Sequence, residues 1–559
     1  MDGYIIGIIV VVFIVIITAA MMLSARSAQK KLRESTSEQF GGMPDTEDLE
    51  FDSISRPWKY CTSQDTFKMI DNITWNDLEM DRVFSRLDSC QTSLGEEYLY
   101  IILHSFSNQK ESDRREALMD CLDREPALRL QLQMYLGRLG KSNYNGLIEF
   151  ISTPEIYKLN HMWLYNVFTW LPAAFLLLFP FNYGLGTICV VGSLCINIMI
   201  SFFSRRKIEQ QIPSVRYFSS VLWCCKQICR KTKTIKDESL SALRQGMREK
   251  LALLHGLQGA ASGSIQNRMI MSDMDTISEF GRMLTLHEIR NYNKLIRLIT
   301  ANKQQCKELC ESIADLDVTI AILSFRKSLQ FYSKPHFIKD MQLNVQELYH
   351  PLLRNAVPNS VVFPGDTLIT GSNASGKSTF IKAVAVNGIL AMAVNTCTAR
   401  VYQAPRQLVI SSMAVKDDLL AGESYFVAEI KSLKRVLEHV KRVPCLCYID
   451  EILKGTNTVE RIAASTAVLR YLHQQKCLCL VASHDVELTQ ILEGKFENYH
   501  FNEQITSEGI AFDYLIKPGP SKTTNAVKLL AYINFDEEIV QNAETMVKDF
   551  EQTGNWGNL

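Results

Sequence analysis

A long uncharged stretch lies at the start of the chain. Residues 3–23 carry no charge, and the basic residues Arg26, Lys30 and Lys31 follow them. As a helix, twenty such residues are about 30 Å long, which matches the hydrocarbon core of a bilayer. The acidic start and the late basic residues favour an uncleaved transmembrane anchor at 1–23 over a signal peptide. The basic flank places the C-terminal side of this anchor in the cytoplasm.

A second apolar block covers residues 161–204. Pro180, Asn182 and Gly184 interrupt it and split it into two segments of spanning length, so the pattern predicts a transmembrane helical hairpin. Lys158 precedes the block and a basic cluster follows it from Arg205, which keeps both outer ends cytoplasmic. The alternative is a buried helix pair in a soluble domain. With the first anchor, the hairpin predicts a multi-pass membrane protein with three spans.

The remaining segments before residue 340 show mainly helical spacing. Residues 24–80 are polar and read as a cytoplasmic linker, and residues 81–160 form a first helical region. Apolar residues three and four apart, over 235–257 and again over 289–316, predict two long amphipathic helices within 205–340. Their apolar stripes are packing surfaces on the simpler interpretation and a ligand site on the weaker one.

Short strands and helices alternate from residue 341 to 540, which is typical of an α/β nucleotide-binding domain, and a tail covers 541–559. The predicted fold class is therefore a multidomain α plus α/β protein. It consists of a transmembrane helix, a membrane hairpin, helical levers and a C-terminal P-loop domain.

Residues 370–379 match the phosphate-binding pattern Gly-x-x-x-x-Gly-Lys-Ser without a mismatch. Predicted strands at 361–363 and 367–370 precede the motif, and a predicted helix at 378–394 follows it, which is the required order. Backbone N–H groups and the helix N-terminus would bind a polyphosphate. Lys377 would reach the β- and γ-phosphates of ATP, and Ser378 would hold Mg²⁺. The predicted nucleotide-binding residues here are Gly371, Ser372, Asn373, Ala374, Ser375, Gly376, Lys377, Ser378 and Thr379.

Two later strand ends carry candidate chemistry. A buried-type strand at 445–449 ends in Asp450 and Glu451, which predicts a Mg²⁺ ligand and a general base. A strand at 477–482 is followed by His484, which would lie beside the γ-phosphate as a third catalytic group with Lys377 and Glu451. The alternatives are a solvated acidic loop and a structural histidine.

Charge and cysteine content narrow the classes of partner. Lys plus Arg and Asp plus Glu both number 60, so no overall basic excess indicates a nucleic acid. The 15 cysteines follow no disulfide framework and read as reduced, packed thiols, although Cys224, Cys225 and Cys229, or Cys306 and Cys310, could hold a metal. Five basic residues between 226 and 236 are explained more simply by anionic lipid head groups than by DNA.

Several motifs together resemble the MutS family of ATPases. They are the P-loop at 371–379, the block from Asp417 to Glu429, the run at 450–456 and the segment that begins at Ser483. Upstream, residues 87–95 and 315–318, with His350, resemble parts of the MutS core and the entry to its ATPase, and residues 512–530 resemble its closing segment. The resemblance implies an ATPase that works as a homodimer, in which Ser424 completes the partner subunit's nucleotide site.

The chain also departs from that family. Residues 24–80 are too few for the mismatch-reading and connector domains, and the stretch at 258–285, where the DNA clamp should lie, has no cluster of basic and aromatic residues. Leu453 and Lys454 replace a glycine and an arginine. The favoured interpretation is a membrane-anchored ATPase that moves its helical levers and acts on an unknown protein partner. The alternatives are a membrane-tethered protein that binds mismatched or branched DNA and, less favoured, an ATP-binding-cassette transporter.

Overall fold

A computed structural model describes most of the chain after residue 23. The residues that it does not describe are 1–23, 25–26, 28–29, 45–48, 62–68, 106–107, 142–145, 160–161, 209–210, 255–285, 373–374, 414–424, 455, 507–508, 522–525, 534 and 554–559. The predicted anchor at 1–23 therefore lies outside the described residues. The chain forms two compact units, one of residues 1–64, 87–101 and 109–328, and the other of residues 65–86, 102–108 and 329–559.

The first unit is helical and is built around α17 (Lys303–Ser328), which is buried from Ile313 to Arg326. Within this unit other helices, among them α7, α9 and α13, pack against α17, and α13 lies against α12. The other helices are α2 (Phe51–Ile54), α3 (Arg56–Cys61), α6 (Ser93–His104), α7 (Gln109–Arg124), α8 (Pro126–Leu139), α9 (Leu147–Ser152), α12 (Ile212–Lys231), α13 (Glu238–Leu253) and α16 (His287–Ala301). The two predicted amphipathic helices appear as α13 and as the pair α16 and α17, which is interrupted at Asn302.

Two motifs far apart in the sequence meet inside the first unit. The Asp317 carboxylate accepts hydrogen bonds from the Thr92 hydroxyl at 2.6 Å and from the backbone N–H groups of Thr92 and Gln91. Gly95 lies so close to this carboxylate that an added Cβ would be 2.4 Å from Asp317 Oδ2. The Thr-Ser-Leu-Gly and Asp-Leu-Asp-Val segments that carry the family resemblance thus form one buried junction.

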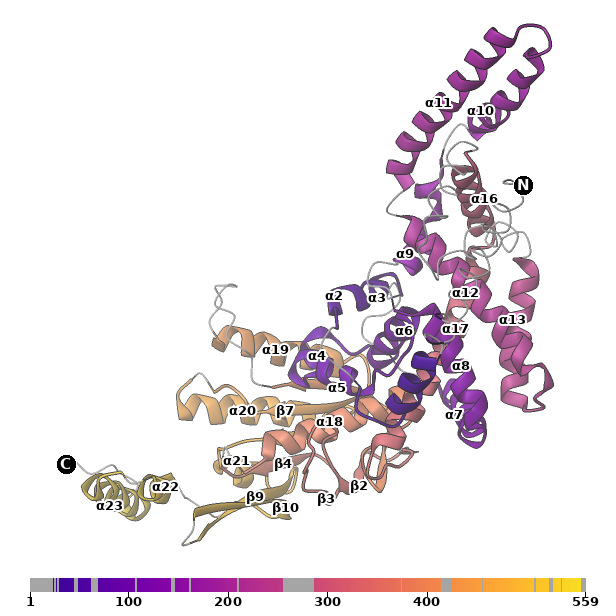
Figure 1. Ribbon diagram of the computed structural model, residues 1–559. Coiled ribbons are helices and arrows are strands. Elements are labelled where there is room, and N and C mark those ends of the chain that lie inside the picture. Colours follow the sequence, from indigo (N-terminus) through magenta and orange to yellow (C-terminus); the bar gives the residue numbers. More distant parts are fainter. Residues whose placement is uncertain are drawn as a thin grey trace. The chain divides into compact units, whose positions relative to one another are not determined.

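The predicted hairpin is a helical pair, α10 (Met162–Phe175) and α11 (Tyr183–Ile208), joined by a short 3-10 turn (Leu176–Leu178) (Figure 1). Its apolar side chains face outward, with Trp163 at 64%, Trp170 at 67% and Phe181 at 88% exposure. This exposure argues against the alternative of a pair buried in a soluble domain. By length and composition, Pro154–Leu178 and Tyr183–Ser204 are long and apolar enough to cross a membrane, as is α18 (Lys377–Val394), which is instead largely buried in the second unit.

The second unit contains two sheets. The larger sheet has the strand order β10-β9-β4-β8-β7-β6, with β10 antiparallel to β9 and the remaining pairs parallel, and the smaller sheet has the order β1-β5-β2-β3. The strands of the larger sheet are β4 (Thr367–Thr370), β6 (Leu408–Ser412), β7 (Cys445–Asp450), β8 (Cys477–Ala482), β9 (Glu497–Thr506) and β10 (Gly509–Pro518). The smaller sheet consists of β1 (His336–Ile338), β2 (Leu343–Leu348), β3 (Asn359–Phe363) and β5 (Val401–Pro405). α18, α19 (Tyr425–Val440) and α20 (Thr458–His473) pack on the larger sheet, and a short helix, α21 (Glu487–Ile491), follows β8. The strands and helix predicted around the P-loop, and the two strands predicted to end at Asp450 and Ala482, are present.

The structure differs from the expected linker and tail. α4 (Asn72–Asp77) and α5 (Met80–Leu87) are ordered helices, and α4 packs on β6 of the second unit. Asp71 caps α4 and pairs with Arg435, and the Trp75 ring is buried. Residues 69–80 therefore belong to the α/β unit, because tertiary contacts stabilise a helix too short to be recognised from its own pattern. At the other end, α22 (Ala526–Tyr532) and α23 (Glu537–Thr553) make most of the expected tail helical.

Candidate nucleotide-binding site

The phosphate-binding loop joins β4 to α18, as its sequence predicts. Gly371 has φ +142°, and a Cβ there would be 2.7 Å from the Phe501 carbonyl oxygen. Gly376, with φ +101°, is the N-cap of α18. Both positions require glycine, because an L side chain would clash or adopt an unfavourable backbone conformation. The loop therefore lies at the N-terminus of a long buried helix. There the free backbone N–H groups and the helix dipole stabilise an anion.

The Lys377 side chain is folded into this loop. Its ammonium group donates to the carbonyl oxygens of Gly371 at 2.5 Å and Ser372 at 2.6 Å, and only 2% of the residue is exposed. The two carbonyl groups fix the ammonium group at the centre of the loop. A phosphate group in the loop would exchange neutral carbonyl acceptors for charged oxygens, which form stronger hydrogen bonds.

Asp450 ends β7 beside the end of β8. The residue is buried, and its Oδ1 atom has no hydrogen-bond partner among the described residues. A buried carboxylate oxygen without a donor is costly unless a cation compensates it. Ser378 lies half-buried at the first turn of α18. Asp450 and Ser378 are hard oxygen ligands of the kind that Mg²⁺ prefers, so these residues fit the predicted metal site.

Glu451 contacts two nitrogen groups. One carboxylate oxygen is 2.7 Å from the Lys454 ammonium nitrogen, and the other is 2.7 Å from His484 Nε2. Glu451 and Leu453 both have left-handed backbones, with φ +57° and +60°. At Leu453, where the MutS motif has glycine, this conformation costs about 1–2 kcal/mol. The turn after β7 is therefore strained at the residues that position Glu451, as is common at functional sites.

His484 links the turn to the phosphate loop. Burial lowers its pKa, and the nearby positive charges of Lys377 and Lys454 lower it further, while a hydrogen bond with the Gly371 backbone acts in the opposite direction. The lowered pKa favours the neutral form of the ring over an ion pair with Glu451. Lys377, Asp450, Glu451 and His484 thus lie near one another, with Lys454 as an added charge.

A cavity of about 440 Å³ opens beside the loop. Gly376, Ser378 and Thr379 line one side, and His350 and Tyr514 contribute to the rest. The Tyr514 ring is 3.1 Å from the position that a Gly376 Cβ would occupy. A cavity of this size with a flat aromatic side chain next to a phosphate loop can hold a nucleoside.

Asn359 and His350 are site residues whose structural roles sequence reasoning missed. The Asn359 side chain donates to the Tyr514 carbonyl oxygen at 2.9 Å and accepts from the Ile516 N–H at 2.8 Å, so it fixes the strand that carries Tyr514. Burial, with the charge of Lys382, lowers the pKa of His350 to about 4. Only the family resemblance pointed to His350, and no local pattern marked Asn359.

Some predicted site residues fall where the structure gives no description. Asn373, Ala374 and Ser424 lie outside the described residues. At the edge of that gap, the buried Glu429 on α19 accepts a hydrogen bond from the Lys454 backbone N–H at 3.1 Å. The block that contains Ser424 is therefore connected through α19 to the turn that carries Glu451.

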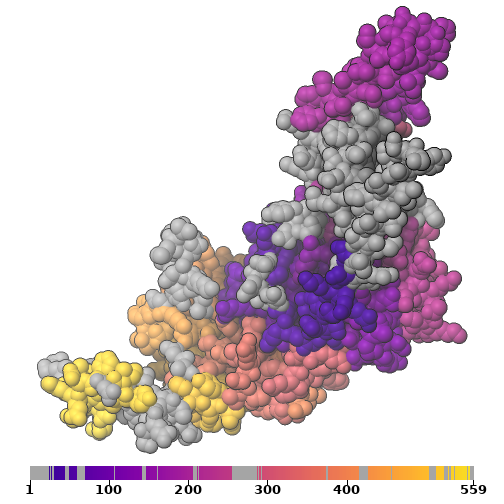
Figure 2. All heavy atoms as spheres, viewed as in Figure 1, coloured from indigo at the N-terminus to yellow at the C-terminus, as the bar shows by residue number. Residues whose placement is uncertain are grey.

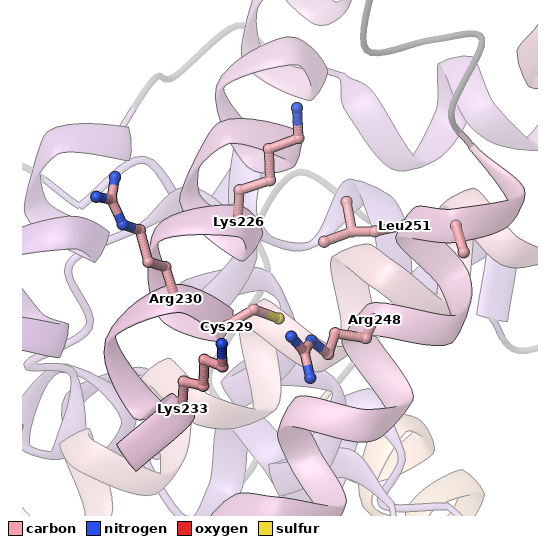
Figure 3. Close-up of a pocket in the computed structure, with 7 residues that line it drawn as sticks. Lys226, Cys229, Arg230, Lys233, Arg248 and Leu251 are labelled. Carbon is pink, nitrogen blue, oxygen red and sulfur yellow. The ribbon is translucent and has the colours of Figure 1, made fainter. Parts of the chain in front are cut away.

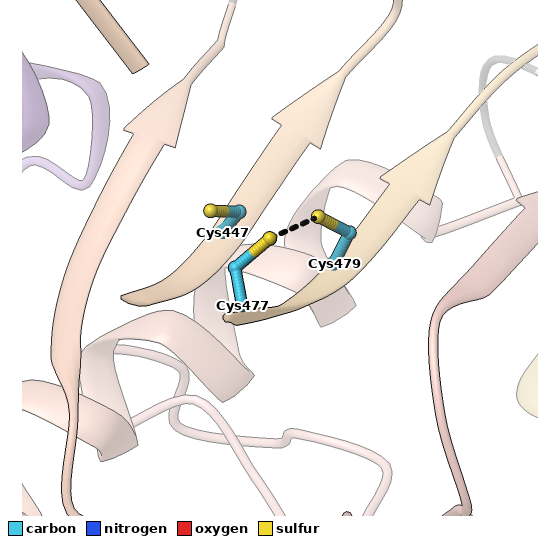
Figure 4. Close-up of side chains that lie close together, drawn as sticks. All are labelled: Cys447, Cys477 and Cys479. Carbon is cyan, nitrogen blue, oxygen red and sulfur yellow. Dashed lines mark hydrogen bonds between the residues drawn. The ribbon is translucent and has the colours of Figure 1, made fainter. Parts of the chain in front are cut away.

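Three thiols form a separate cluster in the larger sheet (Figure 4). The sulfur atoms of Cys447 on β7 and of Cys477 and Cys479 on β8 all lie within 4.8 Å of one another, and all three residues are buried. Hydrogen bonds from Cys447 and Cys479 lower the pKa of Cys477. Three thiolates can bind a soft metal ion, but here the thiols also satisfy one another as a packed core. The other cysteine sets considered from the sequence form no such cluster among the described residues.

Comparisons with known proteins show similarity to one family. The family model described as MutS domain V matches residues 367–551. The DNA mismatch repair protein MutS of Thermus caldophilus is 27% identical over 246 residues, which are 43% of this chain and 30% of that protein. The protein of the same description from Lactobacillus johnsonii is 29% identical over 262 residues, 44% of this chain and 30% of its own length. The protein of the same description from Natronomonas pharaonis is 26% identical over 271 residues, which are 46% of this chain and 31% of that protein. The chain thus spans less than a third of the length of these relatives.

Proposed function

Because the chain belongs to the MutS family, we propose that its α/β unit binds and hydrolyses ATP with Mg²⁺. The observation that carries this proposal is the convergence of Lys377, Asp450, Glu451 and His484 at the ends of adjacent parallel strands. A Gly-rich loop alone would support nucleotide binding. The acidic pair and the histidine beside it supply what hydrolysis needs in addition.

Each residue has a distinct task in this proposal. The loop backbone and Lys377 bind the β- and γ-phosphates, and the cavity beside Tyr514 takes the nucleoside. Ser378 and Asp450 hold Mg²⁺, which when bound neutralises phosphate charge and orients the γ-phosphate. Glu451 accepts a proton from the attacking water, and His484 lies beside the γ-phosphate.

The proposal extends to the assembly. ATP would join two copies of the α/β unit, with Ser424 of each copy completing the other copy's site. A ligand shared by two half-sites stabilises the closed dimer by its differential affinity, and hydrolysis removes that stabilisation. We propose that this cycle moves the helices of the first unit and that the apolar segments place the protein in a membrane, with the ATPase in the cytoplasm. The partner that uses the movement would be a protein held at that membrane.

The decisive experiment measures phosphate release and ATP-dependent dimerisation of the full chain in detergent. Glu451→Gln should abolish turnover and retain dimers that form with ATP, whereas Lys377→Ala should lose both. Glu438→Gln changes an exposed glutamate on α19 and serves as the matched control. Unchanged phosphate release by Glu451→Gln would remove the assignment of the base.

The names of the relatives support a second candidate. Proteins described as DNA mismatch repair MutS match this chain over 43–48% of its length, so binding of mismatched or branched DNA is the alternative function. Because such binding depends on contacts with DNA phosphates, its affinity falls steeply as the salt concentration rises. A gel-shift titration of the full chain across salt concentrations tests it. A steep slope with mismatch preference would favour DNA, and the absence of a shift at low salt would exclude it.

A further inference from the structure

A basic groove lies on the surface of the first unit between α12 and α13 (Figure 3). Its volume is about 500 Å³. Lys226 and Arg230 on α12 and Lys233 in the turn after it line one side, and Arg248 on α13 lines the other. The buried residues Cys229 and Leu251 contribute its floor. We define the basic groove by these four cationic and two buried residues.

Among the residues that the structure describes, the cations of the basic groove have no ion-pair partner, unlike others in the same unit. Arg115 pairs with Asp315, and Arg326 pairs with Glu116. By contrast, none of the four groove cations forms a salt bridge with a residue that the structure describes. From 226 to 236 the sequence has five basic residues and no acidic one, although the whole chain is balanced at 60 of each sign.

This arrangement is costly without a ligand. Like charges on one surface repel one another, and the repulsion is relieved when an anion binds between them. Lys226 and Arg230 are four residues apart on α12, so they project from one side of the helix, and Lys233 follows in the turn after it. Arg248 faces them from a second helix, so an anion in the groove is contacted from two directions. Arginine in such a place recognises phosphate by paired hydrogen bonds.

We propose that the basic groove binds a ligand that carries at least one anionic phosphate group. The volume is in the range of small-ligand sites and is far smaller than the extended track that a duplex requires. The apolar floor at Leu251 suits the carbon part of a phosphate ester. The phosphate belongs to an anionic lipid head group or to a soluble phosphate ester, since both present the same chemistry to the groove.

The experiment uses the full chain in detergent, without ATP, so that its outcome is independent of the proposed ATPase. Binding of inositol hexakisphosphate is measured by calorimetry, and binding of detergent-solubilised phosphatidylglycerol against phosphatidylcholine is measured in parallel. The double variant Arg230→Glu, Arg248→Glu should lower the affinity for the anion at least tenfold. The milder Arg230→Gln, Arg248→Gln pair should weaken it less, and unchanged far-UV circular dichroism shows that both variants fold. Lys110→Glu with Lys303→Glu, at exposed positions elsewhere in the first unit, is the matched control and should leave binding unchanged.

The two arms identify the source of the phosphate. Groove-dependent binding of phosphatidylglycerol alone assigns a lipid head group, and groove-dependent binding of the soluble ester assigns a free ligand. Equal loss in the groove and control variants would overturn the proposal, because it would show a general charge effect. Binding of neither probe would overturn it as well, and so would groove-dependent binding of duplex DNA alone.

Discussion

At the scale of single residues, Glu451 is the centre of the candidate chemistry, and its present contacts oppose that role. The Lys454 ammonium group, 2.7 Å away, stabilises the ionised carboxylate and occupies an oxygen that a water molecule would need. The Lys454 side chain is 38% exposed, so solvent weakens the pair to about 0.5–1 kcal/mol. Lys454 therefore restrains the base without preventing its action.

Lys454→Met should raise ATP turnover about two- to fivefold, because 0.5–1 kcal/mol of restraint is removed from the base. Lys454→Arg keeps the positive charge and should stay close to the unaltered rate. Single-turnover phosphate release measures both, and ATP affinity should not change in either variant. A slower Lys454→Met would instead make Lys454 a group that positions the base.

His350 supports a prediction about pH. Its pKa in the folded chain is about 4, below the ordinary 6.5, because it is buried next to Lys382. The unfolded chain therefore binds a proton between pH 6.5 and 4 that the folded chain does not bind, and stability is complete above pH 6.5 and falls as the pH is lowered. By this linkage the histidine costs about 2 kcal/mol of unfolding free energy at pH 5 relative to pH 8.

His350→Gln should remove this part of the acid destabilisation. Urea unfolding of the full chain, followed by circular dichroism at pH 8 and pH 5, should show a smaller loss for the variant. His336→Gln is the control, since His336 on β1 is exposed. If both variants lose as much unfolding free energy between pH 8 and pH 5 as the unaltered chain does, His350 does not titrate as described.

The residues that the sequence identified are those that belong to continuous motifs. Lys377, Asp450 and His484 each follow a strand with a clear apolar pattern, so their places in a parallel sheet could be predicted. Asn359 and Arg248 could not be predicted, because their partners come from distant elements. Asn359 contacts β10, more than 150 residues later, and Arg248 faces residues of the preceding helix only after α12 and α13 fold back on each other.

At the scale of elements, the junction between α17 and the start of α6 depends on a missing side chain. An added Cβ at Gly95 would be 2.4 Å from Asp317 Oδ2 and 2.9 Å from its Cγ. Both contacts are too short, so the carboxylate that accepts from Gln91 and Thr92 would have to move. Burial raises the pKa of Asp317 to about 6, whereas these hydrogen bonds lower it. The hydrogen bonds are therefore needed to keep the carboxylate ionised.

Gly95→Ala should destabilise the chain by about 1–3 kcal/mol, the usual cost of overpacking. Gly246→Ala is the matched control, because Gly246 also lies in a helix, α13, with nothing within 4 Å of an added Cβ. There the change should stabilise by about 0.5–1 kcal/mol, because alanine favours a helix. Thermal unfolding of the two variants should therefore shift in opposite directions. Shifts of the same sign and size would show that the Gly95 contact carries no energy.

Elements with a long, regular pattern were predicted, and those held by distant contacts were not. α18 and the strands β7 and β8 were identified close to their observed bounds, because their apolar runs are uninterrupted. α4 has six residues and lies in the segment whose sequence predicts a linker. The Arg435 pair with Asp71 and the hydrogen bond from Ser411 to Asp77 attach it to the α/β unit. Such short helices form because of their tertiary contacts, which the local sequence does not contain.

At the scale of the whole molecule, the proposed membrane location rests on the exposed hairpin. Trp163, Trp170 and Ile188 are among the apolar side chains that α10 and α11 expose. Monomeric soluble proteins rarely expose an apolar patch of more than a few hundred Å². A bilayer covers such a surface on all sides, and the basic residues from Arg205 onward would keep both outer ends on the cytoplasmic side.

This topology predicts which cysteines a membrane-impermeant maleimide can reach. Phe181, at the turn of the hairpin, is 88% exposed, and Phe181→Cys should be labelled from the outside of intact cells because the turn would protrude on the non-cytoplasmic side. Cys195, exposed on α11, should stay unlabelled until detergent is added, since lipid would surround it. In inverted vesicles Phe181→Cys should be protected, while Lys307→Cys on α17 should react. Labelling of Cys195 in intact membranes would mean that water reaches the middle of α11, and a protein partner, not lipid, would then have to cover the hairpin.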